Sequence, residues 1–172
     1  ASTGGRYSVI TKSPLTGAIA CSNSGGFIGA ELKSAGWDMI IFEGKSASPV
    51  YLYLENDQAQ LLSADEIWGK SVWETDEILH KIHHDPQLRI AACGRSAEAG
   101  CLYAAIVNDL HRAAGRSGVG TVMASKNLKA IAVIGTKGVG NIKDPARFMQ
   151  TVAEQKQVLA DHAVTGQGLP TL

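Results

Sequence analysis

The sequence predicts an α+β fold in which a strand-rich unit with short helices occurs twice about a pseudo-twofold axis, followed by a C-terminal helix and a linker. The first observation is an internal repeat with a spacing of 91 residues. The corresponding residues are Gly29 and Gly120, Ser34 and Ser125, Ile40 and Ile131, and Gly44 and Gly135. Each copy reads as a glycine-rich loop, a short helix, an apolar strand and a closing glycine. Chance among 19 glycines is the alternative, and the shared order of elements favours duplication.

The remaining elements follow from local patterns. Residues 6–11 alternate as a strand does, and residues 37–44 form the apolar strand of the first copy. Residues 49–54 and 59–62 flank an Asn56-Asp57 turn, which predicts a hairpin. A helix is expected from near Ser71, with a core face of Val72, Ile78, Leu79 and Ile82. Residues 89–94 read as a buried strand.

The C-terminal region has its own start signal. Asp144-Pro145 has the N-cap and first-turn pattern of a helix. Its expected apolar positions are Phe148, Met149, Val152 and Leu159. Residues 165–170 then read as a linker. We therefore predict a domain over residues 1–140 and a helix with a linker over residues 141–172.

Composition excludes several classes of partner. The chain has 172 residues, 45% of them hydrophobic, which suffices for one core. Sixteen basic residues balance sixteen acidic ones, so neither nucleic acid nor an anionic membrane is expected as a partner. No apolar run approaches the roughly 20 residues of a membrane span, and no secretory signal is visible. Cys21, Cys93 and Cys101 have no CxxC spacing, which favours a reducing, cytoplasmic setting.

The second glycine loop, residues 112–120, has a composition suited to phosphate. Arg112 and Arg116 stand beside glycines and small residues, so guanidinium groups and backbone N–H groups can converge on an anion. It is not a nucleotide P-loop, because Thr121 follows where that loop requires lysine. The dinucleotide fingerprint fails as well, because Met123 stands at its third glycine. A loop whose glycines only permit a tight turn is the alternative.

Several motifs, in one order over nearly the whole chain, resemble the N-terminal domain of the aldehyde ferredoxin oxidoreductase family. They are Ser-Pro-Leu-Thr-Gly at residues 13–17, Ser-Asn-x-Gly-Gly at 22–26, Glu-Leu-Lys-x-Ala-Gly-Trp-Asp at 31–38, Arg-Ala-Ala-Gly-Arg at 112–116 and Ser-Lys-Asn-Leu-Lys-Ala-Ile-Ala-Val at 125–133. The resemblance implies a tungsten or molybdenum bis-pyranopterin enzyme with a [4Fe–4S] cluster. Such an enzyme oxidises aldehydes to carboxylic acids and passes electrons to ferredoxin.

The resemblance also implies site residues. Those that match pterin and phosphate contacts are Arg6, Asn23, Gly25, Arg112, Ala113, Gly115 and Arg116. The backbone carbonyls of Asn23 and Ala113 match the ligands of a Mg2+ ion that bridges the phosphates of the two pterins. From the residues alone, Arg6 reads equally as a solvated arginine and Asn23 as a cap. Ser117 and Ala124 depart from the family pattern, which more often has glycine there.

The histidines receive no role from the resemblance. His80 and His84 lie one helical turn apart, but no third ligand stands at matching spacing, so the end of a solvated helix is the ordinary interpretation of His80, His83 and His84.

The cluster-ligating cysteines, a Cys-x2-Cys-x3-Cys set and a distant cysteine, and the proton-transfer residues of the family are not in this sequence. We therefore expect no catalytic residue here, but the cofactor-cradling portion of an enzyme, as a fragment or as a subunit of a split one. The expected partners are the remaining domains or a partner subunit, ferredoxin and a small aldehyde. Assembly into a homo-oligomer is left open. The alternatives are a stand-alone phosphate- or nucleotide-binding module and a structural assembly domain without catalysis.

Overall fold

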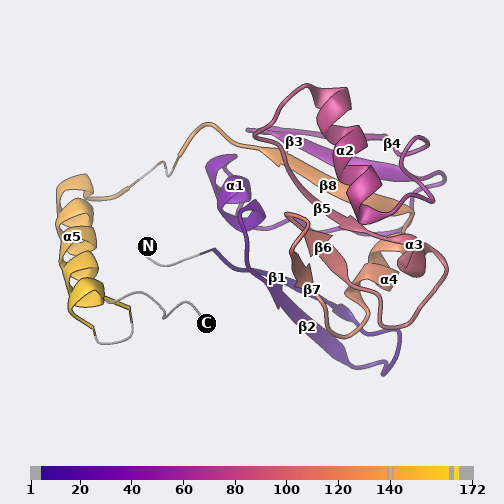
Figure 1. Ribbon diagram of the computed structural model, residues 1–172, viewed down its shortest axis with the longest axis horizontal. Helices are drawn as coiled ribbons and strands as arrows, with labels where there is room; N and C mark the ends of the chain where they lie inside the picture. Colours follow the sequence, from indigo (N-terminus) through magenta and orange to yellow (C-terminus); the bar gives the residue numbers. More distant parts are fainter. Residues whose placement is uncertain (1–4, 139, 141, 163–164, 167–172) are drawn as a thin grey trace. The chain divides into compact units, whose positions relative to one another are not determined.

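The computed structural model describes residues 5–138, 140, 142–162 and 165–166 (Figure 1). The chain divides into two units, residues 5–138 and residues 1–4 with 139–172. The described residues form two sheets and five helices, which confirms the predicted α+β class. None of these helices is long and apolar enough to cross a membrane.

The larger sheet has six strands in the order β4-β3-β8-β5-β6-β7. Their bounds are β3 (Val50–Glu55), β4 (Gln58–Ser63), β5 (Arg89–Cys93), β6 (Ile106–Asn108), β7 (Arg112–Ala114) and β8 (Leu128–Ile134). β3 and β8 run parallel, and the other neighbouring pairs are antiparallel. The predicted hairpin is confirmed as β3 and β4, with Asn56 in the turn at φ 51°. The predicted strand at residues 89–94 is β5.

The smaller sheet is the antiparallel hairpin of β1 (Tyr7–Lys12) and β2 (Ile19–Ser24). Alternate residues of β2 are buried and exposed, which gives the hairpin one face toward the core and one face toward solvent. Figure 1 shows this hairpin beside β6 and β7, at the opposite end of the unit from β3 and β4.

The helices of this unit are α1 (Ile28–Ser34), α2 (Val72–His83), α3 (Arg95–Glu98) and α4 (Val119–Ser125). The start of α2 is fixed by a capping box, in which the Ser71 side chain accepts from the Glu74 N–H and the Glu74 side chain accepts from the Ser71 N–H. Val72 and Leu79 are buried as predicted. Ile82 was also predicted on the core face, but this prediction is wrong: Ile82 lies beyond the edge of the buried stripe and is 42% exposed.

Two hydrophobic clusters lie on opposite faces of the larger sheet. Neighbouring residues along a strand point to opposite faces, so Tyr51 and Ile90 join one cluster while Leu52 and Ala91 join the other. The first cluster includes Val72 and Leu79 of α2, and the second includes buried residues of α1 and α4. The central strands β5 and β8 are thus covered on both faces, as their continuous apolar runs indicate.

The 91-residue repeat is confirmed in its helices and wrong in one strand. α1 and α4 have bounds that differ by 91 residues at both ends. Residues 128–134 are β8, but their counterpart at residues 37–43 is not a strand. β8 is flanked by β3 and β5, whereas no backbone amide of residues 38–43 has a backbone partner in the described part of the chain. Ile40 and Phe42 still pack against the core, while Met39 and Ile41 are exposed.

In the second unit, α5 (Pro145–Asp161) begins at the predicted cap. The Asp144 side chain accepts from the Arg147 N–H at 3.0 Å, and Pro145 occupies the first turn. The predicted apolar positions of α5 are Phe148, Met149, Val152 and Leu159. None of them is buried in the described structure. Of the predicted linker, residues 167–170 lie outside the described residues. The division into 1–140 and 141–172 stays a prediction.

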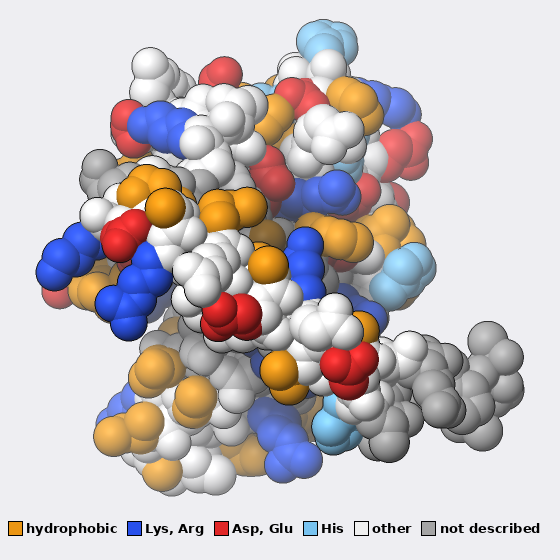
Figure 2. Space-filling view, turned by 90° about the vertical axis from the view of Figure 1, so that its left-hand side faces the viewer, with side chains coloured by type: hydrophobic (Ala, Val, Ile, Leu, Met, Phe, Trp, Pro, Cys, Tyr) orange, Lys and Arg blue, Asp and Glu red, His pale blue; other side chains and the backbone are white. Residues whose placement is uncertain are grey.

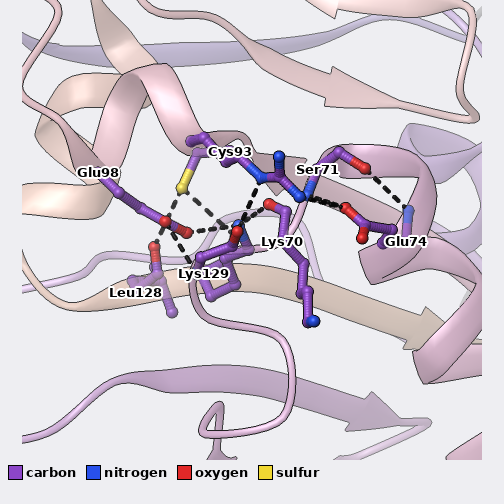
Figure 3. A network of polar contacts seen from close by, with 9 residues as sticks. Lys70, Ser71, Glu74, Cys93, Glu98, Leu128 and Lys129 are labelled. Atoms are coloured by element: carbon purple, nitrogen blue, oxygen red, sulfur yellow. Dashed lines mark hydrogen bonds and ion pairs between the residues drawn. The ribbon is translucent and has the colours of Figure 1, made fainter.

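A buried ion pair joins α3 to β8 (Figure 3). The Lys129 side chain is fully buried, and its Nζ lies 2.5 Å from Oε1 of Glu98, whose side chain is 9% exposed. Lys129 Nζ also donates to the Lys70 carbonyl at 2.8 Å, and Glu98 Oε2 accepts from the Gly69 N–H at 2.9 Å. Both charges therefore have several partners, which repays much of the cost of removing them from water.

We predict that Glu98→Gln lowers the free energy of unfolding by about 3–5 kcal/mol, because it leaves the buried Lys129 ammonium without its counter-charge. The matched control is Glu77→Gln, which breaks the exposed ion pair between Glu77 and Lys81 and should cost less than about 1 kcal/mol. Urea unfolding of both variants checks this prediction. Equal losses in the two variants would contradict it.

Candidate functional site

Two segments far apart in the sequence meet at the open end of the β1–β2 hairpin, where Tyr7 pairs with Ser24. One is the first glycine loop, residues 22–29, and the other runs from the end of β6 to residue 116. The Arg116 N–H donates to Ser22 Oγ at 3.1 Å across 94 positions of sequence. The Phe27 N–H donates to Asp109 Oδ2 at 2.7 Å. The two loops that the repeat relates are therefore in direct contact.

The side chain of Asn108 is the centre of this contact. Asn108 is 1% exposed. Its Oδ1 accepts from Ser24 Oγ at 2.6 Å and from the Tyr7 hydroxyl at 2.9 Å. Its Nδ2 donates to the Gly25 carbonyl at 2.9 Å and to Asp109 Oδ2 at 2.7 Å. All four hydrogen-bonding positions of the amide are used, which is the condition for burying such a group without penalty.

Gly26 is the point where the loops approach most closely. Its φ is +92°, which disfavours any residue with a Cβ. A Cβ built there would meet Asp109 Oδ2 at 2.2 Å and Arg112 Cγ at 3.2 Å. The aliphatic part of the Arg112 side chain thus packs against Gly26. A Cβ on the neighbouring Gly25, which the resemblance implies as a phosphate contact, would meet nothing within 4 Å, so the space beside Gly25 is open.

Two polar groups beside the contact are removed from solvent. Burial raises the pKa of Tyr7 to about 12, and its bond with Ser24 opposes that rise only in part. Asp109 Oδ1 is buried and has no hydrogen-bond partner in the described structure. The contact region therefore holds one buried carboxylate oxygen without a donor.

Of the predicted residues Arg6, Asn23 and Gly25, Asn23 lies on the exposed face of the β1–β2 hairpin and the other two lie just outside its strands. Asn23 is directly opposite Ser8, whose hydroxyl donates to Asn23 Oδ1 at 2.5 Å, and both are exposed. Arg6 is exposed and precedes β1. Exposed apolar residues Ile10 and Ile19 continue this face. Figure 2 shows apolar side chains gathered in its lower part, at the level of the hairpin.

The predicted residues of the second loop lie on and beyond β7, the edge strand of the larger sheet. Arg112, Ala113, Gly115 and Arg116 are all exposed. Within the described residues, the guanidinium groups of Arg6, Arg112 and Arg116 form no ion pair or hydrogen bond. Three uncompensated cations beside two contacting loops can bind anionic groups.

Other glycines of the second loop have a packing role. A Cβ on Gly118 would meet the Leu102 carbonyl at 2.1 Å, and one on Gly120 would meet the Ala105 carbonyl at 2.3 Å. These glycines let α4 approach the segment before β6. Ser117, where the family more often has glycine, also has a positive φ of 64°. The ordinary interpretation of the loop as a tight turn therefore accounts for part of its glycine content.

The described residues contain no group of three or more His, Cys, Asp or Glu side chains arranged to hold a metal ion. His80 Nδ1 lies 2.9 Å from the Asp76 carbonyl of its own helix, and His83 stacks on Tyr53 with ring centroids 4.0 Å apart. A metal ion at the two loops would have to use backbone carbonyls and a ligand's own oxygens. β2 and β7 each have an edge without a neighbouring strand, which leaves alternate carbonyls unpaired there.

Sequence reasoning missed Tyr7, Gly26, Asn108 and Asp109. The Asn108-Asp109 pair, shortly before the arginine loop, was the available signal, because such residues often bond to nearby backbone. Nothing local indicates that their partners lie in the first loop, more than 80 positions away.

Comparison with known proteins gives three findings. Residues 1–135 match the family model of the aldehyde ferredoxin oxidoreductase N-terminal domain. A tungsten-containing aldehyde ferredoxin oxidoreductase of Pyrococcus abyssi is 52% identical over 170 residues, 99% of this chain and 28% of the relative. The WOR-like subunit of an aliphatic sulfonate oxidoreductase of Pyrococcus furiosus is 32% identical over 88% of this chain and 26% of the relative.

Among solved structures, the active-site complex BamBC of benzoyl coenzyme A reductase, bound to 1,5-dienoyl-CoA, matches with a TM-score of 0.84 and 39% identity. The match covers 90% of this chain and 23% of that one. The chain thus spans about a quarter of the length of these relatives.

We predict that the stability of the protein falls between pH 10 and pH 12 with a contribution from Tyr7. A free tyrosine loses its proton near pH 10, whereas folded Tyr7 keeps it to about pH 12, so the unfolded state binds fewer protons in that window. The contribution lost is roughly 2–3 kcal/mol. Urea unfolding at pH 9 and pH 11 should show a smaller loss in Tyr7→Phe than in the parent. Identical losses would be the contrary result.

Proposed function

This chain belongs to the aldehyde ferredoxin oxidoreductase family through its N-terminal domain, and from that premise we propose that it cradles a tungsten- or molybdenum-bis-pyranopterin. Arg6, Arg112 and Arg116 hold the pterin phosphates by charge-assisted hydrogen bonds. Gly25 and Gly115 leave room for the phosphates to approach the backbone. The observation that carries the proposal is the direct contact of the two loops, with three cations around them that have no partner in the described structure.

In this proposal the backbone carbonyls of Asn23 and Ala113 would hold a Mg2+ ion. Carbonyl and phosphate oxygens are ligands that suit such a hard cation. Support comes from the position of both residues on edge strands and from their exposure. The side-chain oxygen of Asn23 already accepts a hydrogen bond from Ser8. The ligand proposed is therefore the backbone carbonyl of Asn23 and not its side-chain amide.

The role of this chain is to bind and orient the cofactor, while substrate choice belongs to other parts of the enzyme. The matched relatives are named for an aldehyde, an aliphatic sulfonate and benzoyl coenzyme A, yet all match this same region. A region shared by enzymes of such different substrates is suited to holding the common cofactor. The bound metal–pterin supplies the two-electron chemistry.

For the intact enzyme we propose oxidation of an aldehyde, with water, to a carboxylic acid. This half-reaction releases two protons and two electrons, and a [4Fe–4S] cluster would carry the electrons to ferredoxin. The cluster ligands belong to the remaining domains or to a partner subunit. A reducing, cytoplasmic setting suits the chain, since Cys21, Cys93 and Cys101 are all free thiols.

Elemental analysis of protein purified anaerobically from its native host tests the proposal. We expect tungsten or molybdenum together with about two pterin phosphates per metal and magnesium. Phosphorus without either metal would favour a phosphate- or nucleotide-binding module instead. Absence of both would leave a structural assembly domain.

We predict that Arg112→Ala lowers cofactor retention about 10- to 100-fold, because one charge-assisted hydrogen bond contributes roughly 1.5–3 kcal/mol. Arg147→Ala is the matched control, since Arg147 is an exposed arginine of α5. Metal and phosphorus per chain, measured after dialysis, report the retention. Equal contents in the two variants would remove Arg112 from the site.

A further inference from the structure

We propose that Asn108 is a positioning residue of the cofactor site, which sets the first glycine loop relative to Arg112. The inference rests on the proposed function for the identity of the ligand. Its structural basis is independent of it: Asn108 and Arg112 are directly opposite each other in the β6–β7 pairing. The same short hairpin thus presents Arg112 to solvent and Asn108 to the first loop.

Asn108 fixes the orientation of one peptide unit of that loop. Its Nδ2 holds the Gly25 carbonyl at 2.9 Å. In a trans peptide the C=O and the following N–H point in opposite directions, so the Gly26 N–H points away from Asn108. That N–H has no partner among the described residues. Asn108 therefore fixes the direction of one backbone donor that has no partner in the described structure, and anion-binding loops use such donors.

A second bond holds the loop one residue further on. Asp109 Oδ2 accepts from the Phe27 N–H at 2.7 Å and from Asn108 Nδ2 at 2.7 Å. Two consecutive side chains of the second segment thus hold the Gly25 carbonyl and the Phe27 N–H on either side of Gly26. The positive φ of Gly26 completes the turn between them.

The contacts of Asn108 and Asp109 with the first loop disfavour other positions of that loop. Asn108 is 1% exposed and has all its hydrogen-bonding positions filled, and Gly26 lies against Asp109 and the Arg112 stem. Moving the loop would leave the buried amide short of partners, which is costly. The loop and Arg112 are therefore held in one arrangement before any ligand binds, which lowers the cost of binding.

Asn108→Asp tests the inference with little change of shape. The carboxylate can still accept from Tyr7 and Ser24, but it cannot donate to the Gly25 carbonyl, and it brings like charge beside Asp109. Asn127→Asp is the matched control, because Asn127 Nδ2 donates to the Ser46 carbonyl at 2.8 Å, a bond of the same kind outside the two loops. Both variants are made in the full chain and purified anaerobically from a cofactor-producing host.

Two readouts are compared. In cofactor-free protein, hydrogen exchange of residues 24–29 should be about tenfold faster in Asn108→Asp, as expected for the loss of one hydrogen bond, and unchanged in Asn127→Asp. Tungsten or molybdenum and phosphorus per folded chain should fall about tenfold in Asn108→Asp and match the parent in Asn127→Asp.

Cofactor content equal in Asn108→Asp and Asn127→Asp, with the loop exchange accelerated in the first, would overturn the positioning role while the proposed function stands. A parent protein without metal or phosphorus would overturn the proposed function and the positioning role together. Equal falls in cofactor content in both variants would assign the loss to general destabilisation and would also overturn the inference.

Discussion

A buried side-chain amide must keep every donor and acceptor paired, and in this protein the amide of Asn108 does so with four partners. They are Tyr7 of β1, the consecutive residues Ser24 and Gly25 of the first glycine loop, and the adjacent Asp109. If any of these partners moves, a buried polar group is left unpaired, at a cost of about 1–3 kcal/mol. The smaller sheet, the edge of the larger sheet and the two loops are held together at this point.

Elements with a complete local signal could be predicted from the sequence. The start of α2 near Ser71, the Asn56-Asp57 turn and the Asp144-Pro145 cap depend on neighbours within a few residues, and all three are present. Residues 37–44 have a good strand pattern but are not a strand, because a strand exists only where another one pairs with it. The same pattern gives β8, which has a neighbour on each side.

The candidate site shows the same limit. Family resemblance named Arg6, Asn23, Gly25, Arg112, Ala113, Gly115 and Arg116, and these stay a proposal for cofactor binding. What the sequence could not indicate is how the first loop is held against the second. Asn108 and Asp109 look like ordinary turn residues until the fold brings the first loop within hydrogen-bonding distance of them.

The central claim is that a metal-bearing cofactor sits where the two loops meet. The most direct measurement is anomalous diffraction at a tungsten or molybdenum absorption edge from crystals of the anaerobically purified protein. We predict a single strong metal peak beside Gly25, Arg112 and Ala113, with phosphate density reaching both loops. A metal peak remote from these residues, with neither loop contacting phosphate, would contradict it.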